Sequence, residues 1–233
     1  MHLHIPDGVL PPLVWAPAVL VSLVLMVVSA RIRGRGTRQR VAYQAALGAL
    51  TLAAMAIEIP LGPLEYHLTL VGPIGVLLGA AGAFEVMFVV NVILALLGHG
   101  GFTVVGLNAL VLGAGAALAR PTYMAFARRL TPGVALALAT VVAQASSGVL
   151  WLIVVSYALR AGAATAGQAA GAGRLGLVAG LMFPMWLVGI AVESVVAVGI
   201  GRFLARVRPD LLPVPRDAAA GSPGPEPRGL EAA

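Results

Sequence analysis

The sequence predicts an all-α integral membrane protein built as a seven-helix bundle. Hydrophobic residues make up 60% of the 233 residues and charged residues only 10%, against about 45–50% and about 25% in soluble domains. Glycines are spread through the apolar runs, where small residues let helix backbones approach closely. The basic residues fall in three short clusters between apolar runs, a pattern typical of cytoplasmic membrane loops. We therefore expect a helical bundle in a lipid bilayer and no nucleic-acid partner.

The first apolar segment, residues 13–30, is long enough to cross a bilayer. No Lys or Arg precedes it, and its basic cluster at residues 31–40 follows it, so we interpret it as a retained helix and not as a signal peptide. Basic clusters stay in the cytoplasm, so this segment runs inward. The N-terminus, with Met1, His2 and His4, is therefore expected outside.

The other basic clusters set the number of the remaining crossings. A segment at 41–58 returns outward and brings His67 to the outer side. Between His67 and the cytoplasmic Arg120 the number of crossings must be odd, which predicts three segments, at 70–82, 84–97 and 103–119, with a break near Gly79 to Gly82. The first two are short for full spans, so one or two short or broken helices are expected.

The last two helices are predicted at 133–158 and 176–201, followed by the third basic cluster, so the C-terminus is expected in the cytoplasm. An Ala/Gly-rich linker over 160–174 is expected to be mobile. Residues 1–208 are expected to form one transmembrane domain, which carries any substrate-binding site, and residues 209–233, rich in Pro, Gly and Ala, are expected to form a disordered cytoplasmic tail. The protein is therefore placed in the cell (inner or plasma) membrane as a multi-pass protein.

The N-terminus carries a set of metal-binding nitrogens. The amine of Met1, the deprotonated amide of His2 and the His2 imidazole present three nitrogens in one plane, and His67 is the natural fourth donor. Square-planar nitrogen coordination suits Ni(II) and Cu(II), and Co(II) can adopt it. The chain has no cysteine, so a thiolate site is excluded. Glu65 is placed to orient the imidazole of His67.

His99 has two interpretations. The glycines on either side mark a tight turn, and a solvated turn histidine is the simpler interpretation. The alternative is a contact with the metal or with its ligands, because the predicted topology brings His99 to the same outer face as the other three histidines.

These residues resemble the CbiM/NikM family, the substrate-binding (S) membrane subunits of energy-coupling-factor transporters for cobalt and nickel. The segment His4-Ile5-Pro6-Asp7-Gly8 is similar to the N-terminal signature of the family, and His67-Leu68 resembles its loop histidine. Three further stretches are similar to family motifs: Gly98-His99-Gly100-Gly101-Phe102-Thr103, Gly106 with Asn108, and Ala191-Val192-Glu193.

The resemblance implies seven helices, an outside N-terminus, and metal binding through the Met1 amine, the nitrogens of the second-residue histidine and His67. It adds Asn108 to Glu65 and His99 as a candidate residue that would orient the metal ligands without being one itself. It also implies three kinds of partner: a transmembrane coupling (T) subunit, a pair of cytoplasmic ATPases and a small accessory membrane subunit.

The chain departs from the family signature in two places. Two extra residues precede the motif, so alignment makes His4 the ligand, whereas chelation with the amine makes it His2. Three explanations are open: translation starts at Leu3, Met1 and His2 supply the planar nitrogens with His4 as an additional or replacement ligand, or the extension abolishes tight chelation. His99 stands where the family has aspartate.

The predicted function is high-affinity binding of Ni(II) or Co(II) at the extracytoplasmic face for ATP-driven uptake. The metal is cargo, and no resident cofactor is expected. The chain lacks a His-Glu-x-x-His sequence and a nucleotide motif, so it is not expected to be an enzyme, and ATP hydrolysis belongs to partners. The alternatives are a substrate-binding subunit for a small organic cofactor (a vitamin) and a non-metal permease. Nickel and cobalt both accept this nitrogen set, so the sequence does not favour either.

Overall fold

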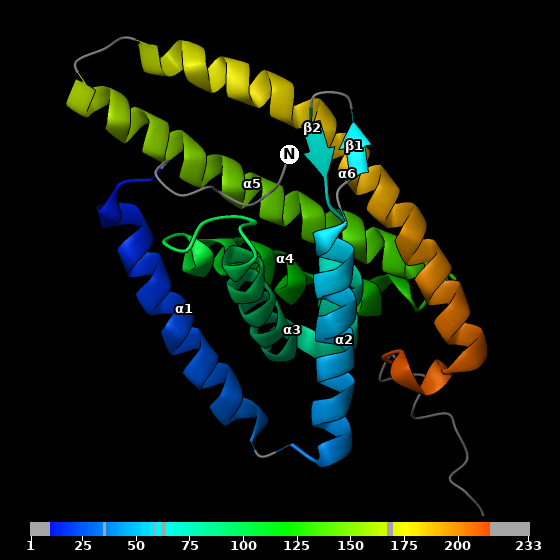
Figure 1. Cartoon of the computed structure of the whole chain (residues 1–233). Coiled ribbons are helices and arrows are strands. Elements are labelled where there is room, and N and C mark those ends of the chain that lie inside the picture. Colours follow the sequence, from blue (N-terminus) through cyan, green and yellow to red (C-terminus); the bar gives the residue numbers. More distant parts are fainter. Residues whose placement is uncertain (1–9, 35, 58, 62–63, 167–169, 215–233) are drawn as a thin grey trace, which may run out of the picture.

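The computed structural model describes residues 10–34, 36–57, 59–61, 64–166 and 170–214, and side chains are described in most of these. Within these ranges the chain forms six α-helices, one β-hairpin and a short 3-10 helix (Figure 1). The elements in chain order are α1 (Pro12–Arg33), α2 (Arg38–Ala56), β1 (Ile59–Leu61), β2 (Leu64–Tyr66), α3 (Val71–Leu96), α4 (Val105–Phe126), α5 (Pro132–Ala166), α6 (Ala170–Val207) and η1 (Pro209–Leu211).

The helices make this an all-α membrane protein, as predicted. Five of them, α1, α3, α4, α5 and α6, contain stretches long and apolar enough to cross a bilayer. Large apolar side chains point outward along α1, among them Leu20, Val24 and Val27. A wide exposed apolar surface of this kind is stable against lipid and not against water.

Local sequence explains both ends of α1 and the start of α2. Pro12 starts α1, where its missing N–H costs nothing, and Gly34 ends it with a φ of 63° that favours glycine. Thr37 caps α2, since its side chain accepts a hydrogen bond from the N–H of Arg40 at 3.3 Å. Gly34 and Thr37 therefore separate two helices that share one basic cluster.

Three details differ from the sequence prediction. The two segments predicted at 70–82 and 84–97 follow one another without a loop, as the two parts of α3 on either side of a break at Gly79, so the described residues contain six helices when α3 is counted once. The linker predicted at 160–174 is helical where the structure describes it, because α5 continues to residue 166 and α6 begins at 170, as the high helix propensity of alanine favours. Residues 209–214 of the predicted tail are described, and Leu212 packs in the main core; the rest of the predicted tail, 215–233, lies outside the described residues.

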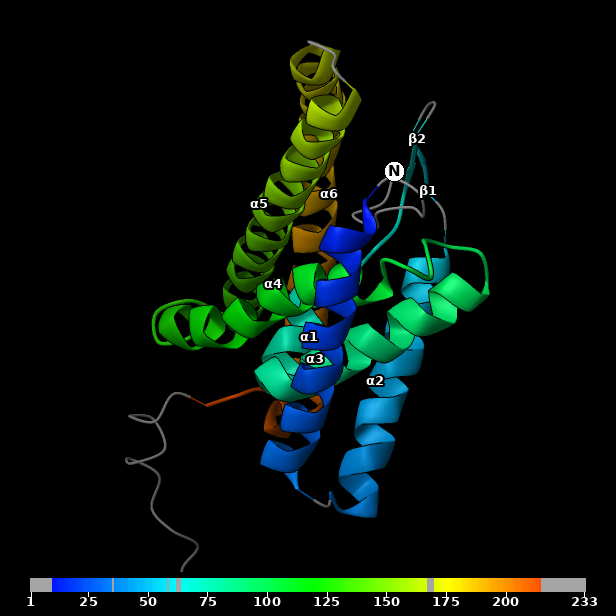
Figure 2. The ribbon, with the colours of Figure 1, turned by 90° about the vertical axis from the view of Figure 1, so that its left-hand side faces the viewer.

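The bundle has two chemically different ends. The β-hairpin that precedes His67 lies at one end, at the top of Figures 1 and 2, while the α1–α2 connection and the C-terminal end of α6 lie at the other. The hairpin pairs Ile59 with Tyr66 and Leu61 with Leu64 in antiparallel register. Arginines are concentrated at the opposite end, in Arg31, Arg33, Arg38 and Arg40.

Helix α3 is interrupted at Gly79, within the region where the sequence predicts a break. Gly79 has φ 70° and ψ 176°, a conformation that is essentially restricted to glycine. In Figure 2 the two parts of α3 run in different directions. An ideal Cβ at Gly79 would lie 3.2 Å from Nη1 of Arg120, so the arginine of α4 lies against the break.

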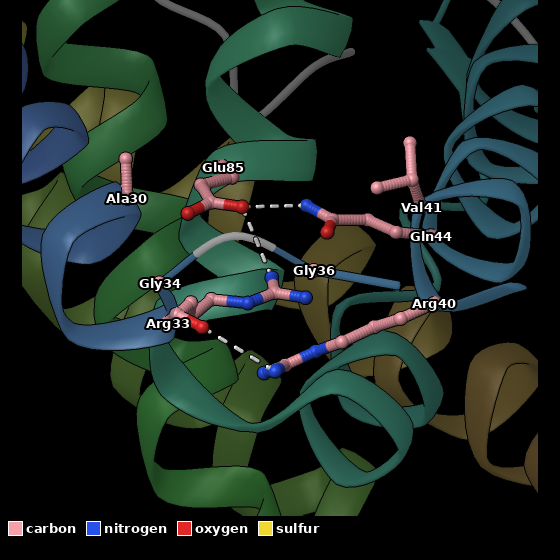
Figure 3. A pocket seen from close by; sticks show the side chains of 8 residues that line it. All are labelled: Ala30, Arg33, Gly34, Gly36, Arg40, Val41, Gln44 and Glu85. Atoms are coloured by element: carbon pink, nitrogen blue, oxygen red, sulfur yellow. Dashed lines mark hydrogen bonds and ion pairs between the residues drawn. The ribbon is translucent and has the colours of Figure 1, made fainter. Parts of the chain in front are cut away.

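An ion pair holds the second part of α3 to α1 and α2 (Figure 3). Nη1 of Arg33 lies 3.0 Å from Oε2 of Glu85, and both side chains are largely buried. Nε2 of Gln44 donates to the same carboxylate oxygen at 2.7 Å. Arg40 donates to the carbonyl of Arg33 at 3.4 Å. These contacts line a cavity of about 200 Å³ at the arginine-rich end.

Replacing Gly79 with alanine is expected to destabilise the fold by about 2 kcal/mol, because the backbone conformation at this position is strained for any residue with a Cβ. Thermal unfolding of the purified protein in detergent measures the change. Gly199→Ala is the matched control: Gly199 lies in α6 with nothing within 4 Å of an added Cβ, and alanine there should be neutral or slightly stabilising. Equal melting temperatures for the two variants would contradict the prediction.

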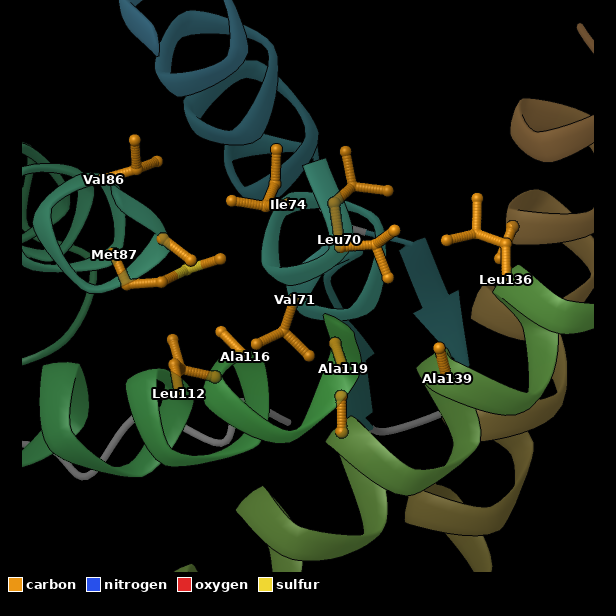
Figure 4. Close-up of a cluster of buried hydrophobic side chains, with 14 of the residues drawn as sticks. Leu70, Val71, Ile74, Val86, Met87, Leu112, Ala116, Ala119, Leu136 and Ala139 are labelled. Atoms are coloured by element: carbon orange, nitrogen blue, oxygen red, sulfur yellow. The ribbon is translucent and has the colours of Figure 1, made fainter. Parts of the chain in front are cut away.

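The core lies where α3 meets α4 and α5 (Figure 4). Both parts of α3 contribute to it: Val71 and Ile74 come from the first, and Met87 from the second. Alanines on α4 and α5 face them, including Ala116 and Ala139. These small residues let the helices approach closely, which places the N-terminal turn of α3, and the loop with His67 before it, against α5.

Candidate metal site

His67 lies between β2 and α3 and is buried, with 5% of its surface exposed. Nδ1 of its ring lies 3.2 Å from the carbonyl oxygen of Ile57. A carbonyl oxygen can only accept a hydrogen bond, so Nδ1 carries the proton and Nε2 has the lone pair that can bind a metal. Such a hydrogen bond fixes the tautomer and the orientation of a metal-binding imidazole.

His99 packs edge-on against His67. The ring centroids are 6.1 Å apart and the ring planes meet at 83°. His99 lies in a turn between Gly98 and Gly100, which have φ values of 83° and 86°, and its N–H donates to the carbonyl of Leu94 at 2.8 Å. Two imidazoles that share a metal have centroids at most about 6.4 Å apart, given a metal–nitrogen distance of about 2.0–2.1 Å. The pair is therefore close enough to share one ion.

The described chain begins in a cluster with the first residues of α4. Leu10 is buried in a cluster with Val104 and Leu107 of the α4 region, and Val104 is five residues beyond His99. The segment that carries Met1, His2 and His4 thus joins the fold at the end of the bundle where His67 and His99 meet. Those three residues themselves lie outside the described part of the chain.

A buried polar network fixes the residues around His67. Oε1 of Glu193, on α6, accepts hydrogen bonds from the N–H of Thr69 at 2.6 Å, the hydroxyl of Thr69 at 2.8 Å and the hydroxyl of Tyr66 at 3.0 Å. Gln144 of α5 donates to the Thr69 hydroxyl at 2.7 Å. Burial, and next the neighbouring Glu193, raise the pKa of the Tyr66 phenol well above its usual range, so Tyr66 stays a neutral donor.

The comparison with protein families identifies the family of this chain. Residues 4–211 match the CbiM family, described as the cobalt uptake substrate-specific transmembrane region. The chain belongs to this family. The match begins at His4 and ends in η1, so it spans almost the whole described structure.

Two solved structures share the CbiM-type fold of this chain. One, described as a transition metal transporter, has a TM-score of 0.75 and 19% identity, and the alignment covers 88% of this chain and 93% of that one. The other, a truncated transition metal transporter, has a TM-score of 0.74 and 20% identity, with 87% and 98% covered. At this identity the likeness concerns the fold. The comparison with curated proteins gave no match.

Two of the seven candidate residues are placed together. The structure of this CbiM-family chain brings His67 and His99 into contact. Asn108 is buried one turn into α4, with its N–H donating to the carbonyl of Val104. Glu65 pairs through its backbone with Pro60 in the hairpin, and its side chain lies outside the described part. The sequence indicated Glu193 only as a motif, because its partners are 124 to 127 residues away.

Proposed function

We propose that this chain is the substrate-binding subunit of an energy-coupling-factor transporter and that it binds Ni(II) or Co(II) at the end of the bundle that carries His67. Membership of a cobalt-uptake family supports metal transport. The observation that carries the proposal is the buried His67, whose Nδ1 is held by the Ile57 carbonyl so that Nε2 is the metal-binding atom. A buried imidazole with a fixed tautomer is typical of metal ligands.

The proposed ligands are the Met1 amine, the His2 amide and imidazole nitrogens, and Nε2 of His67, with His4 as an additional or replacement ligand. Leu10 supports this set, because it anchors the N-terminal segment in the cluster that follows the His99 turn. His99, Glu65 and Asn108 are proposed to orient the ligands or, in the case of His99, to touch the ion. Mass spectrometry of the intact native N-terminus tests the register: a chain that begins at Leu3 would make His4 the planar ligand.

The proposed topology has the N-terminus outside, the C-terminus in the cytoplasm and seven crossings, counting the two parts of α3 separately. The break at Gly79 supports two crossings within α3, and the arginines at the end opposite His67 support the orientation. Movement of the ion would depend on partners: a coupling subunit, a pair of ATPases and an accessory membrane subunit. Transport that stops when the ATPase pair is omitted from proteoliposomes would support this assignment.

The cavity beside Arg33 and Glu85 is small for the vitamin alternative. The cavity beside Arg33 and Glu85 has a volume of about 200 Å³, against about 300–1,000 Å³ for sites that enclose a small organic molecule. It also lies at the arginine-rich end, away from the hairpin. This cavity therefore gives no support to the vitamin alternative.

Metal titration of the protein with its native N-terminus tests the proposed ligand set. Ni(II) and Co(II) should bind with 1:1 stoichiometry, and acetylation of the amine should weaken binding by about 10- to 100-fold, because an amide is a poor donor and one chelate ring is lost. A glycine-extended protein is the second test, since it displaces the amine but leaves an amine present. Unchanged affinity after acetylation would show that the Met1 amine is not a ligand. His67 and His4 would then be tested as ligands by themselves.

A further inference from the structure

Glu193 is a buried carboxylate whose hydrogen bonds converge on the loop that carries His67. It is 1% exposed, and one of its oxygens, Oε1, receives all three donors described above, two from Thr69 and one from Tyr66. These donors flank His67 on both sides in the sequence. The backbone on either side of the imidazole is therefore tied to α6.

The loop is strained immediately after its contact with Glu193. Leu70 has φ 52° and ψ 21°, a left-handed conformation that costs a residue with a Cβ about 1–2 kcal/mol. Such a conformation persists only when surrounding contacts force it. The 2.6 Å hydrogen bond from the N–H of the preceding residue, Thr69, to Glu193 is one of these contacts, and the burial of the Leu70 side chain is another.

Helix α6 is shaped to receive this loop. Trp186, Gly189 and Glu193 follow one another at helical spacing, so they lie on one face. At Gly189 an ideal Cβ would lie 2.9 Å from Cζ of the Tyr66 ring, so glycine leaves the space that the ring occupies. The Tyr66 hydroxyl lies 3.1 Å from the Gly189 carbonyl. Trp186 donates from its indole N–H to the carbonyl of Gln144, which extends the contact to α5.

We propose that Glu193 is a positioning residue for the metal site: it fixes residues 66–69 through Oε1, and thereby sets the place of the His67 imidazole relative to His99. This inference rests on the proposed function and extends it to a residue that does not itself touch the ion. Because Glu193 lies on α6, a change in the tilt of α6 would move the loop and, with it, the imidazole of His67.

The test combines hydrogen–deuterium exchange of the metal-free protein with Ni(II) titration. Glu193→Ala should increase exchange at the amides of residues 66–70, the Thr69 amide above all. It should also weaken Ni(II) binding by about 10- to 100-fold, the usual loss when a residue that orients a metal ligand is removed. The visible absorption of bound Ni(II) should also broaden, because the imidazole is held less uniformly. The separate variant Glu193→Gln keeps an oxygen acceptor, so its affinity for Ni(II) should lie within about threefold of the native value.

Ser147→Ala is the matched control. Ser147 is fully buried and donates to the carbonyl of Val111 at 3.0 Å, between α5 and α4, so its loss removes a buried hydrogen bond that does not involve residues 66–69. It should lower the melting temperature without changing exchange at 66–70 or Ni(II) affinity. If Glu193→Ala does not yield folded protein, Thr69→Val removes the hydroxyl that links Glu193 to Gln144 and tests the same loop.

The outcomes separate this inference from the proposed function. Unchanged exchange at 66–70 in Glu193→Ala overturns the positioning role, whatever the metal affinity. An affinity loss that Ser147→Ala reproduces also overturns it, because global destabilisation would then explain the effect. If the native protein fails to bind Ni(II) and Co(II), the proposed function fails, and the exchange result alone decides whether Glu193 holds the loop.

Discussion

His67→Ala should reduce the affinity for Ni(II) and Co(II) by about 100- to 1,000-fold. The free energy of metal binding at a structural site with four ligands is about 10–16 kcal/mol, so one ligand contributes about 2.5–4 kcal/mol. His67 is expected at the upper end of this range, because its ring is buried and held by the Ile57 carbonyl before any ion arrives. Isothermal titration of the metal-free protein measures the loss.

His99→Ala is the contrasting variant for this experiment. It removes the ring that packs edge-on against His67 but leaves the Ile57 hydrogen bond in place. A loss of about tenfold is expected if His99 only orients His67, and a loss as large as that of His67→Ala would show that His99 is itself a ligand. Tight stoichiometric binding by His67→Ala would exclude His67 from the site and would withdraw the proposed ligand set.

Gly72→Val should destabilise the bundle by about 3 kcal/mol or more. An ideal Cβ at Gly72 would lie 2.5 Å from Cα and 2.7 Å from Cβ of Thr140 on α5, so the first turn of α3 touches the backbone of α5. A backbone cannot move aside as a flexible side chain can, and overpacking of this kind costs about 1–3 kcal/mol and more when the main chain must shift. Loss of monodisperse protein on size exclusion, with a lower melting temperature, is the expected result.

The same variant should also weaken metal binding, because Gly72 follows closely on the residues that Glu193 holds. Gly199→Val is the control, since an added Cβ at Gly199 meets nothing within 4 Å. It should remain folded, with a small cost from the lower helix propensity of valine. Similar melting temperatures for the Gly72 and Gly199 variants would show that α3 and α5 can separate without loss of the fold.

Much of the helical framework can be predicted from the sequence, because crossings are limited by bilayer thickness and by the side on which arginines stay. The expected segment at 13–30 corresponds to α1, and the expected break falls at Gly79. The break could be predicted because the basic clusters indicate an odd number of crossings between His67 and Arg120. The hairpin at 59–66 is not, because each of its strands has only three residues.

The candidate site is less predictable, because it depends on contacts between distant segments. His67 could be selected from its place on the predicted outer loop, but its contact with His99 depends on how the break directs the second part of α3. Glu193 joins Thr69 across 124 residues of sequence, and no local pattern indicates that pairing. The long Ala-rich stretch near residue 160 misled the prediction because low complexity and high helix propensity coincide there.

The ion pair at Glu85 has a consequence for biogenesis. A carboxylate inside an apolar segment is costly in a membrane unless it is paired when it arrives. Both side chains that bind Glu85, those of Arg33 and Gln44, come earlier in the chain, and a chain is made from its N-terminus onward. The partners of this acid are therefore already synthesised when the ribosome reaches α3, whereas an acid placed in α1 would have to wait for its counter-ion.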